Sequence, residues 1–228
     1  MFAINHAATA LVIKRKYPSV PMLWLLLSVQ LMEFLWVVLN YAGVERTTTA
    51  PTVRTLADIH LAYMPYSHSV LSGVGLALVA WAVLAKGLGK STLGAAVGLG
   101  VLSHLILDLL THAPDIALAP FISGPKLGLG LYSSLPMLAF VLETGYGVLC
   151  WVLFRGSKAL LATILLFNLA NLPLFSSAIG SKQILVGHPG IVVTIVALQI
   201  LATLVLVGVL SRRTSPSEAT SSTLPLPG

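Results

Sequence analysis

Six apolar segments, each 20 residues or longer, dominate this sequence and constrain its fold more than any other feature. About 20 helical residues, rising about 1.5 Å each, cross the roughly 30 Å hydrocarbon core of a bilayer. With 57% hydrophobic and only 9% charged residues, the chain is too apolar for a soluble domain. We therefore expect an integral membrane protein, an all-α polytopic bundle of about six transmembrane helices. The segments are 20–43, 66–85, 91–113, 132–154, 159–179 and 190–210.

The two ends of the chain differ from this pattern. Residues 2–13 are apolar but too few to span, and the basic run Lys14-Arg15-Lys16 follows them, which is the reverse of the order in a secretory signal. We expect a short N-terminal helix that dips into the membrane or lies at its surface. Residues 1–210 then form a single transmembrane domain. Residues 211–228, rich in Ser, Thr and Pro, predict a disordered cytoplasmic tail.

The distribution of basic residues predicts the orientation. Alternate loops place nine of the 13 Lys and Arg residues on one side and four on the other, so both termini are expected in the cytoplasm. The formal charge of +6 then reflects topology and contact with anionic membrane lipids, with no nucleic-acid partner. The only cysteine, Cys150, lies inside an apolar segment, so neither a disulfide framework nor a thiolate zinc site is expected.

The segment that begins at Ser91 ends with four ionisable residues where a membrane helix is normally apolar. At about 100° per residue, Asp108, His112 and Asp115 fall within about 80° of His104 and share one face. A carboxylate at the centre of a bilayer helix costs at least about 2.5 kcal/mol. This face therefore predicts a functional site in the bundle interior or in a watery cavity.

The i, i+4 spacing of His104 and Asp108 lets an imidazole and a carboxylate bind one cation. His68 can add an imidazole across the short hairpin between two segments. Counting about 1.5 Å per residue from the basic markers puts Glu33 near the level of His104, and His6 approaches the same layer. The sequence thus indicates a divalent metal, with zinc preferred, in the outer half of the membrane.

Three further residues are candidates for proton transfer: His112, Asp115 and Glu143. His112 is also a candidate third ligand. For Glu33 and Glu143 the alternative is a protonated acid that bonds neighbouring helices. The intramembrane amides are weaker candidates, because such groups often only join helices. They are Gln30, Asn40, Asn168 and Asn171.

The loop after the first long segment also carries a pattern. Within residues 53–63, Leu56, Ile59 and Tyr63 recur at helical spacing, which predicts a short interfacial helix.

Several ordered motifs resemble a bacterial family of membrane-bound metal-dependent hydrolases that looks distantly related to zinc-dependent phospholipase C. They are the early His6, the run Pro65-Tyr66-Ser67-His68-Ser69, and Ser103-His104 followed by Asp108 and Thr111. The similarity covers about the first half of the chain. It implies a bacterial inner-membrane location and metal ligation by His6, His68, His104 and Asp108.

The chain departs from the family pattern at one place. Where many relatives carry a Pro-Asp-x-Asp type motif near the end of the first long helix, this sequence reads Val29-Gln30-Leu31-Met32-Glu33. Gln30 and Glu33 stand in for that motif, and the lost Asp bears on whether a second metal is held.

Three functions are consistent with these residues. The leading hypothesis is a metal-dependent hydrolase in which a metal-activated water attacks a lipid or phosphoester substrate. The first alternative is a transporter or channel in which the acids and histidines form a proton or cation path. The second is a non-catalytic membrane scaffold. The oligomeric state has no signature in the sequence.

Overall fold

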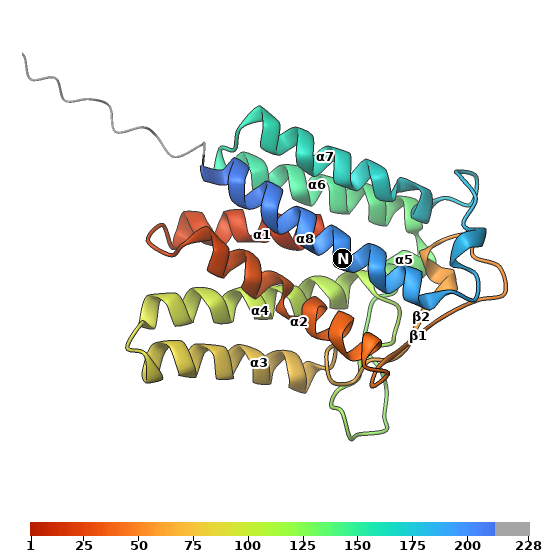
Figure 1. The fold of residues 1–228 in the computed structure, drawn as a ribbon, viewed down its shortest axis with the longest axis horizontal. Helices are drawn as coiled ribbons and strands as arrows, with labels where there is room; N and C mark the ends of the chain where they lie inside the picture. The colour runs from red at the N-terminus through yellow and green to blue at the C-terminus, as the bar shows by residue number, and fades with distance from the viewer. Residues whose placement is uncertain (213–228) are drawn as a thin grey trace, which may run out of the picture.

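The computed structural model describes residues 1–212 as an all-α bundle, which confirms the predicted fold class (Figure 1). Six helices are long and apolar enough to cross a membrane, so the chain is an integral membrane protein. Two of them continue into a turn of different winding, η2 (Val83–Gly87) and η3 (Leu172–Phe175). The six helices are α2 (Met22–Tyr41), α3 (Val70–Ala82), α4 (Ser91–Thr111), α6 (Pro136–Phe154), α7 (Lys158–Asn171) and α8 (Pro189–Arg212).

The expected short N-terminal helix is present as α1 (Ala3–Lys16), and it lies inside the bundle rather than at its surface (Figure 1). It packs against α2, α4, α6, α7 and α8. Its alanines, among them Ala7, Ala8 and Ala10, favour a helix and are fully buried, because small side chains let several helices approach at once. The first residues of the chain are thereby held in the middle of the bundle.

Helix α4 packs against α3 and α2. Its contact with α2 depends on Gly100, where an added Cβ would lie 2.0 Å from the Ser28 hydroxyl oxygen. The absence of a side chain at Gly100 allows the two backbones to approach closely, and one residue further along α2 the carbonyl of Val29 contacts His104.

Helix α4 ends earlier than the sequence analysis assumed. Its last residue is Thr111, and His112 has extended backbone angles, φ −65° and ψ 150°. Pro114 explains the end, because proline excludes the helical conformation of the residue before it and cannot donate its own amide. The helical-face argument was therefore wrong for Asp115, whose position comes from the turn that follows.

The predicted interfacial helix at residues 53–63 is also wrong. Only η1 (Leu56–Asp58) is helical, capped by Thr55, and β2 (Ile59–Tyr63) pairs antiparallel with β1 (Arg46–Thr49). The three threonines of β1 favour extended structure, and the pairing satisfies backbone groups that an isolated helical turn would leave open. This hairpin covers one end of the bundle (Figure 1).

The remaining described elements are short. They are α5 (Leu131–Ser134) and η4 (Gln183–Leu185). Helix α8 reaches Arg212, two residues beyond the expected domain end, and the rest of the expected tail, 213–228, lies outside the described residues. The single-domain prediction stays a prediction.

The close contact of α2 and α4 gives a first test. Gly100→Ala forces a methyl group against Ser28, so we expect a loss of about 1–3 kcal/mol of stability. Gly75→Ala in α3 is the matched control, because an added Cβ there meets nothing within 4 Å. Thermal unfolding in detergent measures both, and equal melting temperatures would contradict the packing described.

Candidate metal centre

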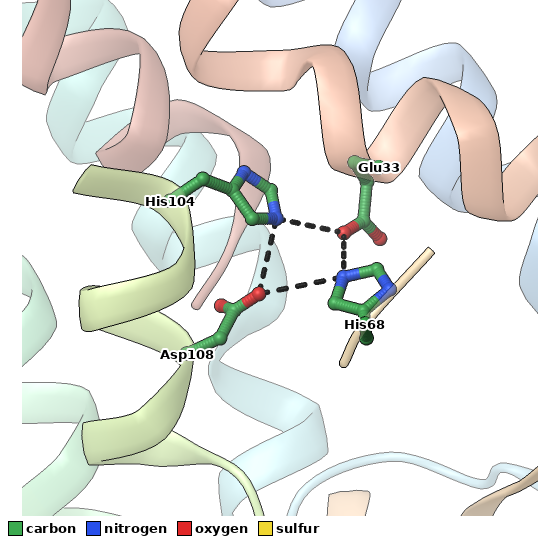
Figure 2. Close-up of side chains that lie close together, drawn as sticks. All are labelled: Glu33, His68, His104 and Asp108. Carbon is green, nitrogen blue, oxygen red and sulfur yellow. Dashed lines mark ion pairs between the residues drawn. The ribbon is translucent and has the colours of Figure 1, made fainter. Parts of the chain in front are cut away.

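Four side chains from three parts of the chain converge at one point: Glu33 of α2, His68 just before α3, and His104 and Asp108 of α4 (Figure 2). One ligand atom from each lies within 4.8 Å of every other. Each imidazole Nε2 faces both carboxylates. The distances are 3.3 Å from His68 to Glu33 Oε2, 3.4 Å from His68 to Asp108 Oδ2, 3.5 Å from His104 to Glu33 Oε2 and 3.0 Å from His104 to Asp108 Oδ2.

These separations are close to those expected between neighbouring ligand atoms of one metal ion. Ligand atoms that bind zinc at about 2.0–2.1 Å in tetrahedral geometry lie about 3.3 Å from one another. The four measured distances range from 3.0 to 3.5 Å. The two histidines and two carboxylates therefore have the spacing of a first coordination sphere around one metal ion.

A hydrogen-bond chain orients His68. The Ser67 hydroxyl donates to Glu45 Oε2 at 2.5 Å, so its oxygen accepts from His68 Nδ1, 2.8 Å away. The proton on Nδ1 leaves the Nε2 lone pair directed at the cluster. The residue stands before α3 because Ser69 caps that helix, accepting from the Ser72 amide.

His104 is oriented in the same way by the backbone of α2. Its Nδ1 lies 2.7 Å from the carbonyl oxygen of Val29. A carbonyl can only accept, so His104 Nδ1 carries the proton and Nε2 is again the free lone pair. Both imidazoles thus present the same nitrogen to the same two carboxylates.

The inward-facing atoms have no hydrogen-bond partner among the described residues, although they are buried. This holds for Nε2 of His68, Nε2 of His104 and Oδ2 of Asp108. Protonated imidazoles would direct their N–H groups at a carboxylate oxygen, whereas here the atoms are close but not aligned for hydrogen bonds. Buried polar groups are nearly always satisfied, so this set calls for a ligand between them.

The cluster strongly attracts positive charge. Burial lowers the pKa of His68, but the adjacent Asp108 and Glu33 outweigh this effect and raise it to about 10, so a metal ion would bind Nε2 in competition with a proton. The amino group of Met1 also lies here and donates to Asp108 Oδ1 at 2.5 Å. It contacts the oxygen that faces away from the four-atom set, so Oδ2 stays available for a metal.

His6, a predicted ligand, lies beside the four but is not one of them. Its ring stacks on that of His104 at 3.8 Å between centroids, and its Nε2 is 3.2 Å from Asp108 Oδ1 rather than Oδ2. Gln30, the proposed stand-in for a family acid, donates instead to the carbonyl of Ala3 at 2.6 Å. His6 therefore connects α1 to the cluster, and Gln30 connects α1 to α2. Neither residue belongs to the inner set.

His112 and Asp115 form a pair at the edge of the cluster. His112 Nδ1 lies 3.4 Å from Asp115 Oδ1, while its Nε2 lies 3.8 Å from Asp108 Oδ1. The pair therefore lies between the cluster and the turn after α4.

Glu143, the third predicted proton carrier, belongs to a different network. Its carboxylate accepts from the Tyr132 hydroxyl, from the Phe2 amide at 3.1 Å and from Asn5 Nδ2 at 2.8 Å. Asn5 also bonds Asn168. These bonds attach the N-terminal end of α1 to α6 and α7, so Glu143 joins helices in this structure.

A cavity of about 360 Å³ adjoins the cluster. Glu33, His68, His112 and Asp115 line it, together with apolar residues of α8. The side chain of Glu33 is 18% exposed, against 2% or less for the other three of the inner set. Glu33 is therefore the ligand candidate most open to a molecule in the cavity.

The sequence analysis missed the residues that position His68, namely Glu45 and Ser67. Glu45 accepts from the amides of Tyr66 and Ser67 as well as from the Ser67 hydroxyl, and thus shapes the turn that carries His68. Ser67 gave a weak signal by preceding His68. Glu45 gave none, because only the folded loop brings it to that turn.

Comparisons with protein-family models, with curated proteins and with solved structures found no match for this chain.

The chain from Glu45 through Ser67 to His68 gives a second test. We expect Ser67→Ala to weaken metal binding by about 10–100-fold, because His68 loses the acceptor that fixes its tautomer. Competition with a calibrated chelator measures the affinity. Ser103→Ala is the matched control, since that hydroxyl bonds only the Gly100 carbonyl of its own helix. Equal affinities in both variants would contradict the role of Ser67.

Proposed function

We propose that this protein is a membrane-embedded metal-dependent hydrolase with one zinc ion held by Glu33, His68, His104 and Asp108. The observation that carries the proposal is that each imidazole Nε2 lies 3.0–3.5 Å from an oxygen of both carboxylates. The His68, His104 and Asp108 atoms are buried and have no hydrogen-bond partner among the described residues, and Glu33 is the partly exposed fourth member. Two imidazoles with two carboxylates at this spacing suit zinc, whereas magnesium and calcium prefer six or more oxygen ligands.

Hydrolysis requires an accessible position and a route for the proton. A bound zinc ion supplies a Lewis acid that lowers the pKa of water from 15.7 to about 7. Glu33 lines the cavity, so a metal held by this residue would be reached by water and substrate from the cavity side. His112, beside Asp108 and paired with Asp115, accepts the proton and passes it to the cavity side.

The family resemblance supports the same proposal. Three of the four residues that it implies as ligands, namely His68, His104 and Asp108, belong to the inner set, and Glu33 completes it. The bacterial inner membrane and cytoplasmic termini are part of the proposal, as is the outer-half location of the site. His6 contributes by packing against His104.

The metal site is tested by an isosteric change. Asp108→Asn removes one charge and one ligand, so we expect near-stoichiometric zinc in the parent protein, purified without a polyhistidine tag, and loss of most of it in the variant. Asp58→Asn is the control, because Asp58 only caps a turn in the outer loop. Plasma mass spectrometry measures metal per chain. A folded parent protein that takes up no metal would refute the proposal and favour a proton path or a scaffold.

Removal of the metal should also lower stability. The cation neutralises two carboxylates within the bundle, and a ligand that binds only the folded state stabilises it by mass action. We expect dipicolinic acid to lower the melting temperature of the parent protein and to leave that of Asp108→Asn unchanged. A chelator effect of equal size in both proteins would show that the metal acts elsewhere.

A further inference from the structure

The cavity beside the metal centre has an apolar wall. Val192, Ile195, Val196 and Gln199 of α8 line it and recur every three or four residues, so they form one stripe along that helix. Leu174 of η3 lines it from the neighbouring helix. Ile195 is 40% exposed, which places it at the rim. All these residues belong to helices long enough to span a membrane.

The cavity also has polar groups with no partner. Trp36 of α2 lines it, and the indole Nε1, which can only donate, makes no hydrogen bond among the described residues although the side chain is 2% exposed. Lys126, an exposed residue of the loop after α4, lines the cavity as well, and no hydrogen bond or ion pair to it occurs within residues 1–212. One unpaired donor and one unpaired cation suit an acceptor oxygen and an anionic group.

We infer that this cavity binds an anionic membrane lipid, with an acyl chain along the α8 stripe and its headgroup between Lys126 and the metal centre. The wall, formed by membrane-spanning helices, adjoins the acyl region of a bilayer, where lipids are the abundant ligands. The indole of Trp36 donates to an ester oxygen of the lipid, and Lys126 pairs with its phosphate. The identification of this lipid as the substrate rests on the proposed hydrolase function.

Photo-crosslinking in vesicles tests the lipid site. The probe is a phosphatidylglycerol with a diazirine in its acyl chain, and the same diazirine on phosphatidylcholine is the zwitterionic comparison, whose choline cation offsets the charge of the phosphate. We expect crosslinks on the α8 peptide that contains residues 192–199, more with the anionic probe. Ile195→Trp fills the rim and should reduce them about tenfold, the effect of a side chain placed in the volume of the ligand. Leu198→Trp, on an exposed face of α8 outside the cavity, should leave them unchanged.

Two smaller changes test the polar contacts. Trp36→Phe keeps the ring but removes the N–H, and should weaken crosslinking by both probes. Lys126→Gln should remove the preference for phosphatidylglycerol. Equal crosslinking in Ile195→Trp and Leu198→Trp, or crosslinks spread evenly over the outer surface, would overturn the inference.

Metal content separates this inference from the proposed function. Ile195→Trp should retain the metal, because Ile195 is not one of the four inner residues. Lipid capture by a parent protein without metal would refute the hydrolase and leave the lipid site as a binding site only. Metal without lipid capture would refute the lipid inference and leave the metal centre.

Discussion

The convergence of two carboxylates, Glu33 and Asp108, inside a helical membrane bundle is the constraint on which the rest of this structure depends. An ionised Asp or Glu removed from water is stable only when cations or donors surround it. Asp108, 1% exposed, has His68 and His104 on one side and His6, His112 and Met1 on the other. Three otherwise separate parts of the chain therefore meet at a single side chain: the N-terminal segment with α1, the turn before α3, and helix α4.

Helix α1 shows how the bundle meets this constraint. It is too short to span, yet its buried alanines allow it to lie between the longer helices. Its polar residues then serve two networks: Asn5 bonds Glu143 and Asn168, and His6 stacks on His104. Helix α1 thus joins the polar networks at the centre of the bundle while its apolar residues, Ile4 and Leu11 among them, belong to the hydrophobic core. The position of α1 also leaves room between α2, α7 and α8, where the cavity reaches the candidate metal centre.

Much of the fold followed from simple counting. The lengths of the apolar segments predicted the six long helices, because a helix that crosses hydrocarbon must satisfy all its own backbone groups. The prediction was poorer outside the membrane. Residues 53–63 follow a helical spacing by chance, and the nine residues between the strand Arg46–Thr49 and the strand Ile59–Tyr63 are too many for a short hairpin turn that the sequence would reveal. The prediction that Asp115 lies near His112 is confirmed. Its reason, a shared helical face, was wrong because the helix ends before Pro114.

For the site, the sequence by itself determined which residue types were available and that His104 and Asp108 lie one helical turn apart, since that spacing is a property of any α-helix. It also indicated that ionisable groups so deep in apolar segments need a shared environment. Only the tertiary structure decided which of them share it. In the folded protein, Glu33 and His68 belong to the inner set and His6 contacts the outer oxygen of Asp108. Glu143 belongs to a separate hydrogen-bond network. The physical reason is that these positions depend on how close α1, α2 and α4 approach, and on the turn that Glu45 and Ser67 hold, which are contacts between residues far apart in the chain.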